Sequence, residues 1–190
     1  MNKPIKITDI LTSKLKSRLR RKPYEHKGHS GKVLLIGGDK GKSGALLLAG
    51  KASLYGGAGW TTLIMFDEAS AHLAEEQPEL MVNFEGDLDS SNFLDEMNPD
   101  VIAIGPGLGM SSKASKWVKQ SLLSNKPVIL DADALNIIAK NKALLSILQK
   151  RDSESIITPH PGEAGSLLGL NSKTIQEDRV KATGLLINLT

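Results

Sequence analysis

The sequence predicts an α/β domain whose central sheet is mostly parallel and is covered by helices on both faces. Short apolar runs bounded by glycine or proline alternate with segments whose apolar residues recur at helical spacing. Four of these runs end in polar or glycine-rich turns, GGDKGKSG, GPGLG, DADALN and TPHPGE. The chain has 190 residues, 40% of them hydrophobic, which suffices for a buried core and excludes disorder.

The individual elements follow from the positions of these runs. We expect strands at 32–36, 60–66, 101–104, 127–130 and 155–157. We expect helices at 43–55, 111–123, 133–139 and 144–148, another after residue 163, and a helical stretch at 173–187. The carboxyl ends of strands in such sheets form the ligand crevice, so the four turns should share one edge. The sequence therefore predicts a binding cleft at that edge.

Composition and charge limit the class of protein. The absence of cysteine excludes a disulfide scaffold, a cysteine zinc site and a thiol nucleophile. No apolar run approaches the roughly 18 residues of a membrane span, and the first residues lack the apolar core of a signal peptide. We expect a soluble, cytoplasmic protein with no membrane partner.

The positive charge is concentrated at the amino end. Residues 1–22 hold eight Lys or Arg and one Asp, while the remainder of the chain is net acidic. Ile10, Leu11, Leu15 and Leu19 recur at helical spacing, so we expect an amphipathic arm that packs on the body or on a neighbouring subunit. No aromatic interleaving and no nucleic-acid motif accompanies the charge, so we expect no nucleic-acid partner. Residues 23–190 form the one domain that we expect.

Two glycine-rich turns are candidate ligand contacts. Residues 37–44 lie between a strand and a helix, where exposed amides could hold an anion. A Walker A loop would need glycine at Ile36, and the spacing of a Rossmann fingerprint is also absent, which disfavours both. The three glycines of residues 105–109 lack side chains, which suits a position where the backbone approaches another group closely. A tight connection and a ligand contact both explain such a turn, and we favour the ligand contact.

The two polar turns add charged and aromatic candidates. Asp131 and Asp133 flank one residue at a strand end, so we expect one to face the cleft and the other to cap the next helix. His160 stands between Pro159 and Pro161, which favours a rigid ligand contact over a surface role. Glu163 follows at a helix start, where it could cap the helix or hold a metal-bound water beside a phosphate.

Taken together, the motifs resemble those of one family, the ATP/ADP-dependent NAD(P)H-hydrate dehydratases of the ribokinase-like superfamily. The matching segments, in chain order, are 26–38 (HKGHSGKVLLIGG), 43–45 (SGA), 57–59 (GAG), 105–109 (GPGLG), 130–135 (LDADAL) and 158–163 (TPHPGE). The resemblance implies a three-layer α/β/α domain that repairs the hydrated form of NADH or NADPH. It implies ATP or ADP as co-substrate and Mg²⁺ as cofactor.

The resemblance also implies roles for individual residues. Ala45, Gly107 and His160 would contact the hydrated dinucleotide and converge on one hollow. Glu163 would lie near the metal and the phosphates. The remaining substrate-side candidates are Gly44, Gly109, Asp131 and Asp133.

The sequence departs from the family at one point. In the family, a Gly-Thr-Gly-Asp segment would supply phosphate-binding amides and the aspartate that takes the hydroxyl proton, and this sequence contains no such segment. We therefore assign no catalytic residue and expect an incomplete domain with an uncovered apolar sheet edge. A fragment, a disrupted gene product and a binding protein without catalysis all remain open.

Two other functions remain as alternatives to dehydration. The chain could be a small-molecule kinase of the same superfamily, acting on a vitamin or sugar alcohol, or a non-catalytic dinucleotide-binding module. We expect a homo-oligomer, because a partner could bury the uncovered edge.

Overall fold

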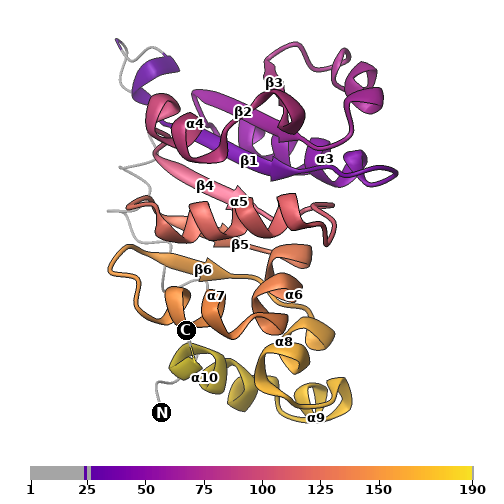
Figure 1. The fold of residues 1–190 in the computed structure, drawn as a ribbon, viewed down its shortest axis with the longest axis vertical. Helices are drawn as coiled ribbons and strands as arrows, with labels where there is room; N and C mark the ends of the chain where they lie inside the picture. Colours follow the sequence, from indigo (N-terminus) through magenta and orange to yellow (C-terminus); the bar gives the residue numbers. More distant parts are fainter. Residues whose placement is uncertain (1–23, 25–26, 190) are drawn as a thin grey trace.

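The computed structural model describes residue 24 and residues 27–189 of the chain. The basic segment 1–22, for which the sequence predicts an amphipathic arm, lies outside the described residues. Within the described part, six strands form one sheet, and helices connect them (Figure 1). The strands are β1 (Lys32–Gly37), β2 (Trp60–Met65), β3 (Leu80–Phe84), β4 (Val101–Ile104), β5 (Val128–Leu130) and β6 (Ser155–Ile157).

Eight α-helices and three short 3₁₀ helices complete the described chain. The α-helices are α3 (Ser43–Tyr55), α4 (Ser90–Met97), α5 (Ser112–Leu123), α6 (Ala132–Lys140), α7 (Lys142–Gln149), α8 (Pro161–Leu168), α9 (Ser172–Glu177) and α10 (Arg179–Leu189). The 3₁₀ helices are η1 (Lys27–His29), η2 (Glu68–Ala74) and η3 (Glu85–Asp87).

The order of the strands places a crevice at the middle of the sheet. The strands lie side by side as β3-β2-β1-β4-β5-β6, and every neighbouring pair is parallel. From β1 the chain moves outward through β2 to β3, returns to β4 beside β1, and then moves the other way to β6. The loops that leave β1 and β4 therefore diverge, and such a reversal opens a crevice at the carboxyl edge.

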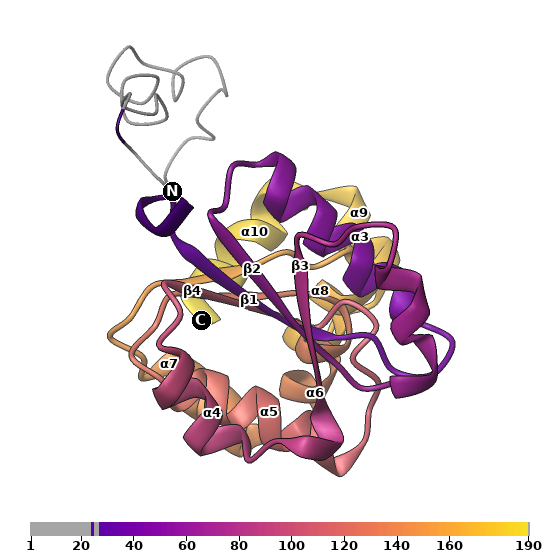
Figure 2. The same cartoon turned by 90° about the horizontal axis from the view of Figure 1, so that it is seen from above.

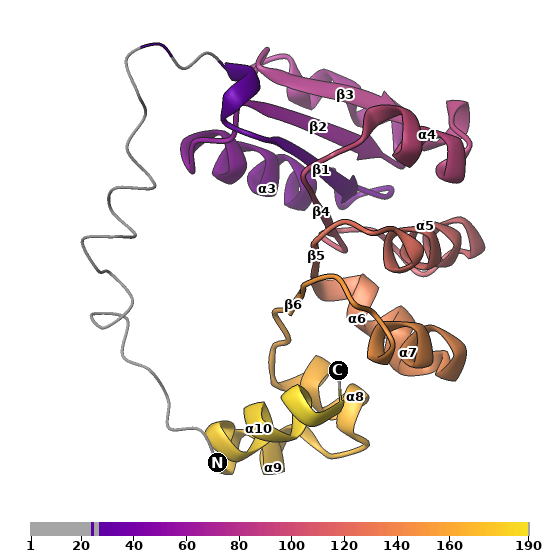
Figure 3. The ribbon, with the colours of Figure 1, turned by 90° about the vertical axis from the view of Figure 1, so that its left-hand side faces the viewer.

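Helices cover both faces of the sheet, which confirms the predicted three-layer arrangement. In Figures 2 and 3, α3 lies on one face, and α4, α5 and α7 lie on the other. Side chains alternate between the faces along β1, so Leu35 packs with the α3 cluster while Leu34 and Ile36 join the cluster around Trp117 of α5. The sheet is thus buried on both sides over its central strands, as apolar parallel strands require.

Close packing of α3 on the sheet explains one of its two internal glycines. A Cβ at Gly50 would stand 3.1 Å from side-chain atoms of both Leu63 and Leu80, so glycine lets the helix approach β2 and β3. The other glycine, Gly44, lies at the start of the helix and has no such neighbour.

Three features differ from the prediction. Strand β3 and helix α4 were not expected, and the helical stretch expected at 173–187 is two helices, α9 and α10. The break falls at Asp178, whose carboxylate accepts from the backbone N–H of Lys181 at 2.8 Å. A side chain that satisfies the free N–H groups of a new helix favours a helix start at that point.

Strand β6 forms one edge of the sheet, where we expected an uncovered apolar edge. The side chain of Ile156 is 57% exposed there. Among the described residues, no helix has the length and apolar character needed to cross a membrane.

Candidate functional site

The turns after β1 and β4 are joined by backbone hydrogen bonds. The N–H of Gly38 donates to the carbonyl of Pro106 at 3.1 Å, and the N–H of Asp39 donates to the carbonyl of Gly107 at 2.6 Å. A Cβ at Gly37 would stand 2.1 Å from the oxygen of Pro106, so only glycine permits this contact. The two glycine-rich turns predicted as ligand contacts thus form one rigid unit.

The turns after β4, β5 and β6 are also in direct contact with one another. A Cβ at Gly105 would stand 1.7 Å from the carbonyl oxygen of Asp131, so the first of these turns packs directly on the second. Thr158, which follows β6, donates its hydroxyl to Oδ1 of Asp131 at 2.8 Å. All four predicted turns therefore lie along the carboxyl edge of the sheet, joined neighbour to neighbour.

A pocket of about 470 Å³ opens where the strand order reverses. We call it the switch-point pocket; its lining residues are Gly41, Lys42, Gly44, Ala45, Gly107 and Asp133. Four of the predicted substrate-side residues are among them. Of the three residues expected to converge on one hollow, Ala45 and Gly107 line this pocket and His160 does not.

Gly44 leaves an open space in this pocket. Apart from its chain neighbours and the backbone of its own helix, no protein atom lies within 4 Å of the position that a Cβ at Gly44 would occupy, and the residue is exposed. Packing within the described chain does not require glycine at this position, so the geometry favours a ligand that approaches the backbone here.

Asp133 faces the switch-point pocket and connects two of its walls. Its Oδ2 accepts from the N–H of Gly109 at 2.8 Å and lies 3.2 Å from Nζ of Lys42. Gly109 is packed on the other side by Asp39, because a Cβ at Gly109 would stand 2.2 Å from Oδ2 of that residue. Asp133 is thus the aspartate of the pair that faces the cleft.

The other aspartate does not cap the helix, contrary to expectation. Asp131 occupies the N-cap position of α6, but its side chain makes no capping hydrogen bond and accepts instead from Thr158. Ala132 follows with φ of 46°, an uncommon left-handed conformation for a residue with a side chain. The chain enters α6 through this residue, while the Asp131 carboxylate is engaged by the neighbouring strand end.

His160 lies at the same sheet edge but outside the lining of the switch-point pocket. Strand β6 stands two strands from β4, a separation of about 10 Å at the usual spacing. The imidazole caps α8: its Nδ1 accepts from the N–H groups of Gly162 and Glu163 at 2.9 and 3.3 Å. The ring hydrogen therefore lies on Nε2, and His160 as a dinucleotide contact stays a prediction.

The buried side chain of Glu163 completes the cap of α8. Its Oε2 accepts from the backbone N–H of His160 at 2.8 Å, and its Oε1 lies 3.1 Å from Nε2 of the same residue. The residue is 5% exposed. Both oxygens already have partners, so Glu163 fits the capping alternative, and its place near metal and phosphates stays a prediction.

The described residues do not by themselves form a metal site. In residues 27–189 no group of three or more His, Asp or Glu side chains could hold an ion. Mg²⁺ needs only one or two carboxylates when the phosphates of a nucleotide supply its other ligands.

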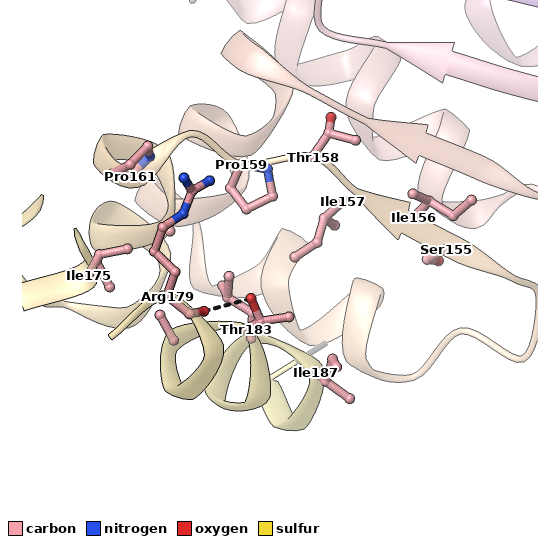
Figure 4. A pocket seen from close by; sticks show the side chains of 13 residues that line it. Ser155, Ile156, Ile157, Thr158, Pro159, Pro161, Ile175, Arg179, Thr183 and Ile187 are labelled. Atoms are coloured by element: carbon pink, nitrogen blue, oxygen red, sulfur yellow. Dashed lines mark hydrogen bonds between the residues drawn. The ribbon is translucent and has the colours of Figure 1, made fainter. Parts of the chain in front are cut away.

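A second groove of about 470 Å³ runs beside the β6 edge (Figure 4). Strand β6 forms one wall, and α10 forms the other with Arg179, Ala182, Thr183, Leu186 and Ile187. Thr158, Pro159 and Pro161 close one end, so the histidine turn stands between this groove and the crevice. No predicted substrate residue lines the groove.

Sequence reasoning missed Lys42 and Thr158 as members of the site. In the sequence, Lys42 belongs to an incomplete Walker A motif. Its position between Gly41 and Ser43 at a helix start nevertheless indicates a possible ligand contact. Thr158 belongs to the distinctive TPHPGE turn, but its bond to Asp131 depends on the pairing of β5 with β6.

The fold and the site together define a ribokinase-like α/β protein. A ribokinase-like superfamily protein from Enterococcus faecalis V583 matches 81% of this chain with a TM-score of 0.69 at 27% identity. The family model described as NAD(P)H-hydrate dehydratase matches residues 33–188, and the chain belongs to that family.

Individual relatives agree with this assignment. The bifunctional NAD(P)H-hydrate repair enzyme Nnr of Escherichia coli K12 is 38% identical over 168 residues, which cover 88% of this chain and 31% of that protein. The ADP/ATP-dependent NAD(P)H-hydrate dehydratase from Bacillus subtilis, co-crystallised with ATP/Mg²⁺, matches with a TM-score of 0.71 at 32% identity. That match covers 85% of this chain and 56% of the other. The chain thus spans about a third of the length of the curated relatives that it matches.

Proposed function

We propose that the chain binds hydrated NADH or NADPH at the switch-point pocket and serves its ATP- or ADP-dependent dehydration. The family match and the names of the relatives support this reaction. The single observation that carries it is the open space at Gly44, beside Ala45 and opposite Gly107. A bulky, partly planar dinucleotide needs such a surface without side chains.

The reaction follows from the chemistry of leaving groups. The hydroxyl of the hydrated nicotinamide ring leaves poorly as hydroxide. Transfer of a phosphoryl group from ATP or ADP to that oxygen releases ADP or AMP and the hydroxyl proton, and it makes phosphate the leaving group. The carbon–oxygen bond then breaks with its electron pair on phosphate, and loss of a ring proton restores the dihydropyridine. The protein contributes positioning and charge neutralisation.

The residues of this chain would bind and orient the dinucleotide. The joined turns after β1 and β4 would receive it against their backbone, and His160 would reach it from the end of β6 with the exposed part of its ring. Mg²⁺, which we expect to enter with ATP or ADP, would neutralise phosphate charge. We assign no catalytic base to the described residues.

Replacement of Gly44 by alanine tests the site. We expect Gly44→Ala to weaken binding of NADPH hydrate at least tenfold, because its methyl group would fill the space left for the ligand. The same change should not destabilise the fold, because alanine favours helix and Gly44 lies in the first turn of α3. Binding is measured by titration calorimetry and stability by urea unfolding.

Gly184→Ala is the matched control. Gly184 is also an exposed glycine within a helix, and no atom beyond its chain neighbours and its own helix backbone lies within 4 Å of a Cβ placed there, but it lies on α10, away from the switch-point pocket. The Gly184→Ala variant should gain about 0.5–1 kcal/mol of stability, because Gly184 is in the middle of its helix, and it should bind normally. Equal affinity of the two variants would contradict the proposed site.

Product analysis separates the proposed function from its alternatives. Recovery of NADPH absorbance on addition of ATP or ADP with Mg²⁺ supports the dehydratase. A stable phosphorylated product without elimination would identify a small-molecule kinase. Tight binding without turnover would identify a dinucleotide-binding module.

A further inference from the structure

Lys42 and Asp133 are the two ionisable residues in the lining of the switch-point pocket. Lys42 belongs to the loop after β1, and Asp133 belongs to the first turn of α6, 91 positions later in the chain. Their side chains meet with Nζ of the lysine 3.2 Å from Oδ2 of the aspartate. The ion pair therefore spans the pocket between two of its walls.

The backbone of Lys42 is fixed, while its ammonium group is accessible. A Cβ at Gly107 would stand 2.5 Å from the carbonyl oxygen of Lys42 and 2.8 Å from its Cβ, so the turn after β4 packs against the start of this side chain. The Lys42 side chain as a whole is 49% exposed. An ion pair of this exposure is weak, because water screens it and the lysine loses side-chain entropy.

Asp133 has a second partner that does not depend on Lys42. The same Oδ2 accepts from the N–H of Gly109 at 2.8 Å. A carboxylate that accepts from a backbone N–H forms a strong, charge-assisted bond. Lys42 can therefore leave Asp133 without releasing the glycine turn.

We propose that Lys42 binds a phosphate group of the dinucleotide and that Asp133 holds the lysine at the pocket until the phosphate replaces it. The proposal rests on the proposed function, because the hydrated dinucleotide supplies the phosphate. A phosphate oxygen accepts from an ammonium group as a carboxylate does, and it carries equal or greater charge. Asp133 is then a positioning residue that acts through Lys42 and Gly109.

The phosphate has two sources, the diphosphate bridge and the 2′-phosphate that only NADPH hydrate bears. Titration calorimetry of Lys42→Ala with both hydrates distinguishes them. We expect about tenfold weaker binding, as for loss of one hydrogen bond to a charged group. An equal loss for both hydrates assigns Lys42 to the diphosphate, and a loss confined to NADPH hydrate assigns it to the 2′-phosphate.

Three comparisons make the test specific. Lys40→Ala removes the same charge from the same loop outside the pocket lining, and it should change affinity less than twofold. Lys42→Arg should retain most of the affinity. The affinity of the wild type should fall with added salt more steeply than that of Lys42→Ala, because a screened charge pair has been lost.

Asp133→Asn tests the part played by the carboxylate. Its amide oxygen can still accept from the N–H of Gly109, while the charge that competes with the phosphate for Lys42 is removed. We expect binding two- to fivefold tighter than wild type, and no such gain when the change is made in Lys42→Ala. Thermal unfolding of each variant verifies the fold.

The outcomes are distinguishable. If the wild type binds the hydrates and Lys42→Ala binds both as Lys40→Ala does, the role of Lys42 is overturned while the proposed function stands. If the wild type binds neither hydrate, the proposed function is overturned and this inference with it.

Discussion

His160 is a side chain whose structural and functional roles overlap. Its Nδ1 accepts from two backbone N–H groups at the start of α8, and Glu163 returns a bond to its own backbone N–H. This reciprocal cap fixes the imidazole and directs Nε2 toward Glu163. The side chain is nevertheless 67% exposed at the carboxyl edge of the sheet, where a ligand could reach it. Alanine substitution alone would remove both roles together.

Asparagine at position 160 separates the two roles. Asparagine is among the best N-cap residues, so His160→Asn should keep stability within about 0.5 kcal/mol, whereas His160→Ala should lose about 1 kcal/mol. If the imidazole contacts the dinucleotide, both variants should bind NADPH hydrate about tenfold more weakly, as expected for one lost polar contact. Urea unfolding and titration calorimetry give the two quantities. Wild-type affinity in His160→Asn would show that the histidine serves the helix alone.

At the scale of elements, helix α4 depends on its first residue. Asp89 is the N-cap, and its Oδ1 accepts from the hydroxyl of Ser91 at 2.5 Å and from the backbone N–H of Ser91 at 2.9 Å. These hydrogen bonds lower the pKa of Asp89 below its ordinary value of 3.8, with the hydroxyl of Ser91 as the largest cause. The folded state therefore favours the charged carboxylate of Asp89 over its protonated form more strongly than the unfolded chain does.

The sign of this shift predicts a pH dependence. Because the folded pKa lies below the unfolded one, the charged cap stabilises the fold above pH 3.8, and this contribution is lost as the pH falls through the folded pKa. Asp89→Asn keeps a capping oxygen without the charge, so its stability should approach that of the wild type as the pH falls below 3.8. Urea midpoints between pH 6 and pH 3 measure this convergence. Asp95→Asn, on the same helix but outside the cap, is the control substitution.

The pattern of apolar residues predicted most elements, because the central strands are buried on both faces. The runs at 101–104 and 155–157 are strands β4 and β6 with unchanged bounds. Strand β3 was not predicted, because only Leu80 of its five residues is buried. Its sequence LMVNF also lacks a clear alternation of apolar and polar residues. Helix α4 was also not predicted, because Leu94 is its one buried large apolar residue. Elements at the margin of the sheet thus carry too little apolar pattern to be recognised.

The site was predictable in its backbone and less so in its side chains. The glycines at 105–109 indicated close backbone contacts, and the structure shows such contacts at Gly105, Gly107 and Gly109. The ion pair of Lys42 with Asp133 could not be predicted, because it depends on how α6 lies relative to the loop after β1. Contacts between residues so far apart in sequence are set by the sheet order and not by a local pattern.

At the scale of the whole molecule, the sheet has two edge strands, β3 and β6, and β6 exposes backbone groups. The N–H of Val128 donates to Glu154, and the N–H of Thr158 donates to Leu130, so the backbone groups of Ser155 and Ile157 point away from β5. They face the groove toward α10 that Figure 4 shows. Ile156 and Ile187 are 57% and 71% exposed beside it. An edge with free backbone groups and apolar side chains is a template for pairing with another chain.

We therefore expect the chain to self-associate through β6, in line with the predicted homo-oligomer. Sedimentation velocity over a range of concentrations should show a species larger than the monomer. Ile156→Lys should shift the equilibrium to monomer, because a charged lysine on an edge strand resists pairing. Leu48→Lys is the control: Leu48 is 70% exposed on α3, away from this edge, and the same substitution there should leave the association unchanged. A wild type that stays monomeric would contradict a β6 interface. An Ile156→Lys variant that associates as the wild type does would contradict it as well.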